Sequence, residues 1–273
     1  MDPLVSTQWL EVRLAGDDLV ALDCSWHMPS TGRSARDEYL HTHIPGARFL
    51  DVDSVADRSN PAPHMLPSAD DFAAAMEKLG IGRDDRIVVY DNSPLRTAPR
   101  GWFMLRHFGA RHVALLDGGL AKWLAEGRAT QAGEPPPRAA SFPTEERDNV
   151  VAKADVLGQP IIDARGQARF EGTEPDPRPG VAAGHIPGAL NLPYAALYNA
   201  DGTFRSPDEL RTLFADAGAD PQAPFVATCG SGVTANSLIF AAHLLGNGRA
   251  RLYDGSWSEW GADPGTPKAL GSA

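Results

Sequence analysis

The residue with the clearest chemical potential is Cys229, which follows a short apolar segment and opens the loop CGSGVT. Residues 225–227 predict a strand, and the apolar spacing from Thr234 onward predicts a helix with Thr234 as its N-cap. A helix N-terminus carries a partial positive charge and unpaired N–H groups, which favour a thiolate over a thiol. Gly230 and Gly232 would let backbone amides surround the sulfur and stabilise an anion. Cys229 is therefore the candidate nucleophile; the alternative is a buried, inert cysteine at a strand end.

Two kinds of thiolate chemistry use a cysteine loop between a strand and a helix: phosphate-ester hydrolysis and sulfur transfer. A phosphate dianion needs a bidentate cation, which phosphatase loops supply with an arginine six residues after the cysteine. Position 235 is alanine here, and the next arginine is Arg249. The loop therefore argues against a phosphatase and fits a persulfide, whose single negative charge needs amides rather than a guanidinium.

The composition of the 273-residue chain limits the class of protein. A hydrophobic fraction of 42% is normal for globular cores, and a net charge of −10 argues against a nucleic-acid partner. The chain has no run of 18 apolar residues and begins without a basic, apolar signal sequence. Its two cysteines, Cys24 and Cys229, do not make a disulfide framework, and Cys24 is expected to be a small buried filler. We expect a cytoplasmic protein of about two domains with no membrane partner.

Three sequence landmarks occur twice, in the same order, at offsets of 140, 142 and 137 residues. They are VALDCSW and PIIDARG (20–26 and 160–166), HIPGA (43–47 and 185–189), and LLDGGLAKW and LYDGSWSEW (115–123 and 252–260). We infer a tandem duplication of a unit of about 120–130 residues. Because both copies carry the histidine of HIPGA, His43 and His185 are expected to be structural rather than catalytic.

Each copy alternates segments that read as strands and helices, which predicts an α/β fold with a parallel sheet and helices on both faces in each domain. In the first copy, strands are expected at 19–23, 86–90 and 112–116, and helices at 68–79, 100–108 and 119–126. In the second copy, helices are expected near 207–217, from 234, and near the end. A proline-rich linker at 131–150 would separate a first domain, 1–130, from a second domain, 151–273.

The two copies differ at the point where the chemistry is expected. RIVVYD aligns with PFVATC, so Asp91 takes the place of Cys229, and no glycine cradle follows it. Only the second copy can host thiolate chemistry. The first copy must serve another purpose, such as completing the site.

Four features together resemble the tandem rhodanese-domain sulfurtransferases: CGSGVT, the doubled HIPGA, the doubled Asp-Gly segment leading to tryptophan, and RFEGTEPDPRPG. The resemblance extends from about Val5 to Gly261. Thiosulfate-preferring members have a basic loop of the form CRKGVT, which suits a doubly charged donor. The neutral Gly230 and Ser231 are similar to the branch that uses 3-mercaptopyruvate. The resemblance implies two rhodanese-like domains, sulfane-sulfur transfer through a Cys229 persulfide with release of pyruvate, and no metal or organic cofactor.

The resemblance also implies a set of site residues. Ser231 would form a relay with His64 and Asp53 that protonates the pyruvate enolate, with Asp53 fixing the tautomer of the imidazole. Arg169 and Arg178 would bind the carboxylate and carbonyl of the donor, because planar guanidinium groups hold such oxygens well. The remaining substrate-binding positions lie in the cysteine loop: Gly230, Gly232, Val233 and Thr234. Since His64 and Asp53 come from the first copy, the site is expected between the domains.

The expected reaction has two covalent half-reactions and ping-pong kinetics. The acceptor would be thioredoxin, another thiol or cyanide. Two alternatives stay open at this stage. One is a thiosulfate:cyanide sulfurtransferase with the same fold, and the other is a non-catalytic rhodanese-like module that binds a partner or senses oxidants.

Overall fold

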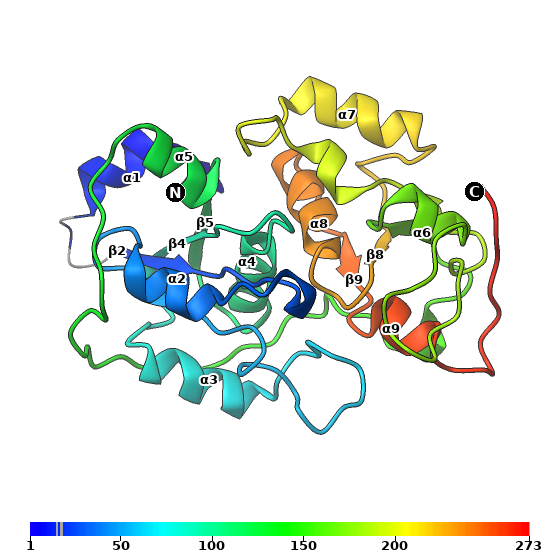
Figure 1. Cartoon of the computed structure of the whole chain (residues 1–273), viewed down its shortest axis with the longest axis horizontal. Helices are drawn as coiled ribbons and strands as arrows, with labels where there is room; N and C mark the ends of the chain where they lie inside the picture. The colour runs from blue at the N-terminus through cyan, green and yellow to red at the C-terminus, as the bar shows by residue number, and fades with distance from the viewer. Residues whose placement is uncertain (15, 17–18, 273) are drawn as a thin grey trace. The chain divides into compact units, whose positions relative to one another are not determined.

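The structure is a computed structural model that describes residues 1–14, 16 and 19–272. The chain forms two compact units (Figure 1). Unit 1 comprises Met1–Ala56, Leu66–Asp148 and Ala200–Phe204, and unit 2 comprises Asp57–Met65, Asn149–Asn199 and Arg205–Ala273. Two short segments therefore belong to the unit opposite to the one that their sequence position suggests. The boundaries predicted at 130 and 151 divide the chain into consecutive segments, whereas these two segments join their units through contacts with residues far away in the sequence.

Unit 1 contains a five-stranded parallel sheet with strand order β1-β5-β4-β2-β3. Its strands are β1 (Leu4–Val5), β2 (Leu19–Asp23), β3 (Arg48–Phe49), β4 (Arg86–Tyr90) and β5 (His112–Leu116). Its helices are α1 (Thr7–Arg13), α2 (Ala35–His41), α3 (Ala69–Lys78), α4 (Ala98–His107) and α5 (Gly119–Ala125), with a 3-10 turn η1 at Pro29–Thr31. The continuous apolar runs of β2 and β4 reflect burial on both faces, as expected for central parallel strands.

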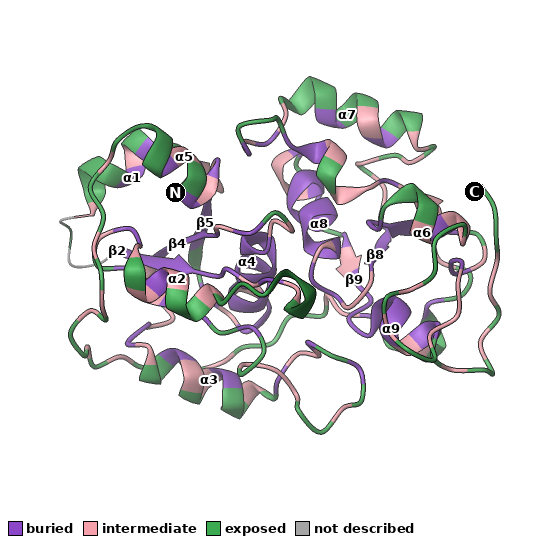
Figure 2. Cartoon of the chain, in the orientation of Figure 1, coloured by how far each residue is buried: buried purple, intermediate pink, exposed green. Residues whose placement is uncertain are grey.

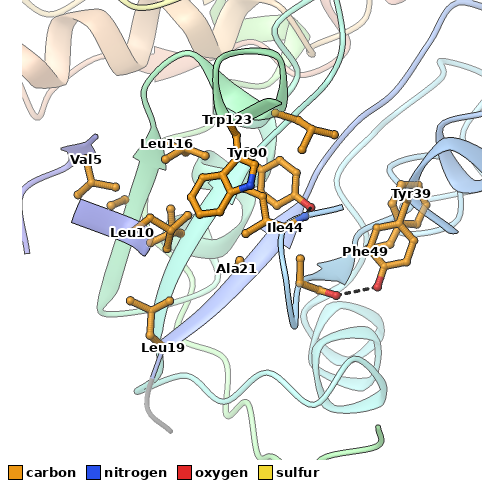
Figure 3. Close-up of a cluster of buried hydrophobic side chains, with 14 residues drawn as sticks. Val5, Leu10, Leu19, Ala21, Tyr39, Ile44, Phe49, Tyr90, Leu116 and Trp123 are labelled. Atoms are coloured by element: carbon orange, nitrogen blue, oxygen red, sulfur yellow. Dashed lines mark hydrogen bonds between the residues drawn. The ribbon is translucent and has the colours of Figure 1, made fainter. Parts of the chain in front are cut away.

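Side-chain alternation divides the core of unit 1 between the two faces of the sheet. On one face, alternate strand residues such as Ala21, Tyr90 and Leu116 pack with Leu10 of α1 and Trp123 of α5 (Figure 3). The opposite face contacts α4, whose following residue Phe108 stacks on Phe72 of α3 with ring centroids 4.3 Å apart. Helices thus flank both faces, as the alternation of elements predicts.

Unit 2 repeats this plan with a four-stranded parallel sheet in the order β7-β6-β8-β9. The strands are β6 (Ile161–Asp163), β7 (Leu190–Asn191), β8 (Val226–Thr228) and β9 (Arg251–Leu252). The helices are α6 (Gln167–Glu171), α7 (Pro207–Asp216), α8 (Ala235–Leu244) and α9 (Ser256–Trp260), with 3-10 turns η2 (Lys153–Asp155) and η3 (Tyr194–Leu197). Helix α8 is buried over most of its length, whereas α7 buries only one face (Figure 2). Helix α8 is thus the central helix of this unit.

The duplicated landmarks make equivalent contacts in the two units. His43 and His185 are both buried, and each places Nδ1 on a backbone carbonyl, Tyr39 O at 2.7 Å and Phe170 O at 2.9 Å. Each imidazole also stacks on the aromatic ring whose carbonyl it contacts. The predicted structural role of both histidines is therefore confirmed.

Some local predictions need correction. Helices α1 and α2 lie in segments where no helix is predicted from the sequence. Each has seven residues, and their N-caps are Ser6 and Ser34. Such short helices are set by packing and capping rather than by a long apolar period. Thr234 stands at the start of α8 but makes no capping hydrogen bond through its side chain. Across the described residues, no helix is both long and apolar enough to cross a membrane.

Asp23, at the end of β2, should make the stability of unit 1 depend on pH. Burial raises its pKa to about 7, with repulsion from Asp91 adding to the effect and hydrogen bonds from Ser25 opposing it. A carboxyl whose folded-state pKa exceeds its unfolded value contributes full stability below pH 4, and this stability is lost as the pH rises through 7. Asp23→Asn keeps an oxygen for the Ser25 amide, 2.8 Å away, but cannot ionise.

We expect the free energy of unfolding of Asp23→Asn, relative to that of the wild type, to increase between pH 4 and pH 7. The increase should reach up to about 4 kcal/mol, at roughly 1.4 kcal/mol per pKa unit. Thermal unfolding of both proteins at closely spaced pH values measures this difference. A stability difference that stays constant over this range would contradict the prediction.

Candidate active site

Cys229 lies directly after β8 and before α8, in unit 2, as the sequence predicts. The residue is only 1% exposed, yet its surroundings are polar. Two backbone carbonyl groups at the start of the loop accept hydrogen bonds from α9. Trp257 N donates to Cys229 O at 3.0 Å, and Ser258 N donates to Gly230 O at 2.9 Å. The first turn of α9 therefore holds the start of the cysteine loop.

The side chain of Ser256 organises the same loop from inside. Its Oγ accepts hydrogen bonds from Cys229 N and Gly232 N, both at 3.1 Å, and lies 4.0 Å from Cys229 Sγ. Its single proton has two acceptors within reach, Tyr253 O at 2.9 Å and the thiol sulfur. One buried hydroxyl thus joins both ends of the loop to the reactive sulfur.

Ser256 adopts a backbone conformation that serine rarely takes, with φ of +50°. The equivalent position of the first copy is Gly119, which has φ of +58° and no such penalty. A left-handed conformation in a residue other than glycine costs about 1 kcal/mol or more and tends to occur at functional sites. The hydroxyl is therefore retained at an energetic cost, which supports a role in the chemistry of Cys229.

The cysteine loop does not use all its amides internally. Within the part of the chain that the structure describes, the backbone N–H groups of Gly230, Ser231, Val233 and Thr234 donate to no protein acceptor. Gly232 has φ of +71°, and a Cβ there would lie 2.5 Å from Asp254 O, so the turn requires glycine. Four amides of the loop therefore lack a protein acceptor, whereas those of Cys229 and Gly232 donate to Ser256 Oγ.

Ser231 and His64 are brought together, with Ser231 Oγ 3.0 Å from His64 Nδ1. Residues Asp57–Met65 belong to unit 2 even though they come from the first copy in sequence. His64 is 9% exposed and has φ of +63°, a left-handed backbone conformation that is uncommon for residues other than glycine. The pair has the geometry for proton transfer between a hydroxyl and an imidazole.

Asp53, the third member of the predicted relay, belongs to unit 1. Its Oδ2 accepts a hydrogen bond from Trp26 Nε1 at 2.9 Å, and its backbone N–H donates to Asp51. Its carboxylate is thus oriented by the indole of Trp26. Its part in the relay stays a prediction.

The two predicted carboxylate-binding arginines converge beside the cysteine loop. Arg178 Nη1 donates to Gly230 O at 2.7 Å, and a Cβ built on Gly230 would lie 3.2 Å from Arg178 Nη2 and 3.4 Å from Arg169 Nη2. Both guanidinium groups therefore lie against the residue that follows Cys229. Their side chains are about a quarter exposed, at 25% for Arg169 and 26% for Arg178.

Asp176 holds these two arginines in place. Its side chain is 1% exposed and accepts from Arg169 Nη2 at 2.6 Å, Arg178 Nε at 2.8 Å and Arg178 Nη2 at 3.0 Å. Burial alone would raise the pKa of Asp176, but hydrogen bonds from Arg178 and Arg169 more than offset this and lower it. The carboxylate is therefore charged whenever the two guanidinium groups are in this arrangement.

Sequence reasoning missed Ser256, Asp176 and Asn236, whose Nδ2 donates to Gly232 O and Val233 O at 2.6 and 2.9 Å. Comparison of the two copies could have found Ser256, because a serine stands where the first copy has a glycine in the same turn. The Pro-Asp-Pro context marks Asp176 as a rigidly held residue. Asn236 carries no comparable signal, since an asparagine in the first turn of a helix is common.

Comparisons with known proteins identify the family of the chain. A family model described as the rhodanese-like domain matches residues 6–126 and 145–263. The human 3-mercaptopyruvate sulfurtransferase is 42% identical over 270 residues, which cover 94% of this chain and 91% of the human protein. The thiosulfate sulfurtransferase of Cricetulus griseus is 41% identical over 271 residues, which cover 94% and 91% of the two chains.

Among solved structures, the crystal structure of SseA from Escherichia coli, described as a 3-mercaptopyruvate sulfotransferase with the rhodanese fold, superposes with a TM-score of 0.86. It is 37% identical, and the match covers 95% of this chain and 100% of that one. The family model matches both copies, each unit contains a sheet of parallel strands, and the cysteine loop lies in the second unit. These findings lead to one assignment. The chain belongs to the rhodanese family and carries two rhodanese-like domains in tandem.

Proposed function

We propose that the protein is a sulfurtransferase that moves a sulfane sulfur from 3-mercaptopyruvate to an acceptor through a persulfide on Cys229. The observation that carries this proposal is that the two residues directly after Cys229 contact two groups of side chains. Arg169 and Arg178 lie against Gly230, and Ser231 contacts His64. An α-keto acid needs a cation for its carboxylate and a proton for its carbon, and these two groups provide them.

In the first half-reaction, the Cys229 thiolate attacks the thiol sulfur of 3-mercaptopyruvate and forms an S–S bond. The C–S bond breaks, and its electron pair passes into the enolate of pyruvate. The proton released from the donor thiol returns to carbon, so that pyruvate leaves and Cys229 carries a persulfide. The Ser231–His64 pair, 3.0 Å apart, is suited to relay this proton. Asp53 would fix the tautomer of His64.

The outer sulfur of the persulfide carries about one negative charge, which the free amides of the cysteine loop can stabilise at the N-terminus of α8. The loop residues next to the cysteine, Gly230 and Ser231, are neutral and add no further positive charge. In the second half-reaction an acceptor thiolate, such as that of thioredoxin, or cyanide removes the outer sulfur. Cys229 then returns as a thiolate, so the scheme predicts ping-pong kinetics.

Relatives named for 3-mercaptopyruvate and for thiosulfate are 42% and 41% identical to this chain. The local chemistry favours 3-mercaptopyruvate. The two guanidinium groups lie against Gly230, the residue after Cys229, and planar guanidinium groups bind carboxylates well. Thiosulfate has no carboxylate and no carbon that needs a proton, so it would use neither the arginine pair nor the Ser231–His64 pair in this way.

Intact-mass spectrometry after treatment with each donor tests the proposal. With 3-mercaptopyruvate we expect the wild-type mass to increase by one sulfur atom, with one pyruvate released per protein, and cyanide should then reverse the increase. Cys229→Ser should gain no sulfur, whereas Cys24→Ser is the matched control and should load like the wild type. A wild-type protein that gains no sulfur from either donor would indicate a non-catalytic module.

Initial rates with the two donors decide between the two activities. We expect kcat/KM for 3-mercaptopyruvate to exceed that for thiosulfate. The opposite order would identify a thiosulfate:cyanide sulfurtransferase and would contradict the donor proposed here.

A further inference from the structure

The arrangement around Asp176 contains two cations and one anion rather than two free cations. Asp176 contacts Arg169 through one carboxylate oxygen and Arg178 through both, at distances between 2.6 and 3.0 Å. The Arg178 backbone N–H also donates to Asp176 Oδ1 at 3.0 Å. Every polar contact described for this carboxylate therefore goes to the two arginines or to the backbone of one of them.

The loop that carries Asp176 is built to hold it rigidly. The sequence around it is Glu-Pro-Asp-Pro-Arg, and each proline fixes its own φ and restricts the residue before it. The carboxylate is buried, whereas a quarter of each guanidinium side chain stays exposed. Asp176 therefore lies behind the arginines, on the side away from solvent, and cannot itself meet a donor.

The charges of these three side chains sum to about +1, since one carboxylate faces two guanidinium groups. A monocarboxylate such as 3-mercaptopyruvate brings one negative charge to this group, and the resulting cluster is neutral. A doubly charged donor such as thiosulfate would leave an uncompensated negative charge in a partly buried place, which is unfavourable. The charge of Asp176 thus distinguishes donors that the arginines alone would not distinguish.

We propose that Asp176 determines donor specificity by positioning Arg169 and Arg178 and by reducing their combined charge to match a monocarboxylate. This inference rests on the proposed function, because it concerns the same site and the same class of donor. Asp176 touches no reacting atom, so it is a positioning residue rather than a catalytic one. Its effect reaches the donor only through the two guanidinium groups.

The test compares three variants with both donors. Asp176→Asn keeps the size of the side chain but removes its charge, so kcat/KM for 3-mercaptopyruvate should fall about tenfold, mainly through KM, as for one charge-assisted hydrogen bond. The kcat/KM for thiosulfate should stay the same or increase, because the arginine pair then carries a charge of about +2. Asp176→Glu restores the charge and should bring the donor ratio back toward that of the wild type.

Glu174→Gln is the matched control, since Glu174 lies two residues earlier, is exposed, and donates to Ala168 O only through its backbone N–H. It removes one negative charge from the same loop and should leave the donor ratio unchanged. If Asp176→Asn lowers both efficiencies by the same factor, Asp176 is merely structural and the inference is wrong. The same conclusion follows if Glu174→Gln shifts the ratio as strongly as Asp176→Asn.

A binding measurement separates this inference from the proposed function. Calorimetry with pyruvate and with sulfate, which have one and two charges and transfer no sulfur, reports on the arginine pair without catalysis. Asp176→Asn should weaken pyruvate binding about tenfold and should not weaken sulfate binding. Equal weakening of both would overturn the inference even if the wild type proves to be a 3-mercaptopyruvate sulfurtransferase. The expected contrast would support it even if the preferred donor proves to be thiosulfate.

Discussion

Replacing Ser256 with alanine should lower kcat/KM for sulfur transfer about 100-fold, the usual effect of removing one preorganised hydroxyl or amide from a site that stabilises an anion. The hydroxyl accepts from Cys229 N and Gly232 N and lies 4.0 Å from the thiol sulfur. Without it, two buried N–H groups lose their acceptor, and the loop loses the contact that connects its two ends. Steady-state rates with 3-mercaptopyruvate and a thiol acceptor measure the effect.

Ser256→Gly separates the hydroxyl from the backbone strain. Glycine tolerates the φ of +50°, as Gly119 does at the equivalent place in unit 1. We expect Ser256→Gly to lose activity as Ser256→Ala does, but to be about 1 kcal/mol more stable than Ser256→Ala, because it relieves the left-handed strain. Thermal unfolding of the two variants provides this comparison.

Ser258→Ala is the control for Ser256. Ser258 is also in α9 and is nearly as buried, but its hydroxyl donates to Gly255 O and touches none of the loop amides. Its activity should stay near that of the wild type. If Ser256→Ala has the kcat/KM of the wild type, or if Ser258→Ala loses as much kcat/KM as Ser256→Ala does, the Ser256 hydroxyl has no particular part in catalysis.

The parts of the site that could be predicted from sequence are those carried by local patterns. Cys229 was identifiable because a strand, two glycines and a helix follow one another within ten residues, and Asp91 marked the first copy as lacking a thiol. Continuous apolar runs identified β4 and β5 at their observed bounds. In each case the determining interactions lie between neighbours in the chain.

The parts that could not be predicted depend on contacts between distant segments. Nothing local to residues 57–65 indicates that they join unit 2 and place His64 on Ser231, 167 residues later. The ion pairs of Asp176 are local, because Arg178 and Arg169 are two and seven residues away, but their place beside the cysteine loop depends on the contact of Arg178 with Gly230, 52 residues later. A resemblance to a known family supplied His64, Arg169 and Arg178, but it did not supply the residues that hold them.

A second large effect is expected at Arg165, whose role is to stabilise the unit that carries Cys229. Its guanidinium makes three contacts of 2.7 to 3.1 Å to the Asp163 carboxylate and donates to Gly184 O at 2.8 Å. Both side chains are almost completely buried, at 2% and 1% exposure. The guanidinium also lies over the ring of Trp257, 4.6 Å from its centroid. In the first copy Ser25 stands at this position.

Arg165→Met should destabilise unit 2 by about 3–5 kcal/mol, because it leaves the Asp163 carboxylate buried without its cation. The double variant Asp163→Asn/Arg165→Met should recover part of this loss, since the remaining polar group is then neutral. Chemical denaturation followed by tryptophan fluorescence measures both, because Trp257 packs directly on Arg165.

The control for Arg165 is Arg211→Met, which removes the exposed ion pair with Asp208 on α7, where both side chains are more than half exposed. An exposed pair contributes at most about 1 kcal/mol, so this variant should unfold nearly like the wild type. The contrast matters for function, because Trp257 N also holds Cys229 O. A loosened Trp257 should therefore reduce the rate of persulfide formation at temperatures well below unfolding. If Arg165→Met unfolds like Arg211→Met, the buried pair does not support the cysteine loop.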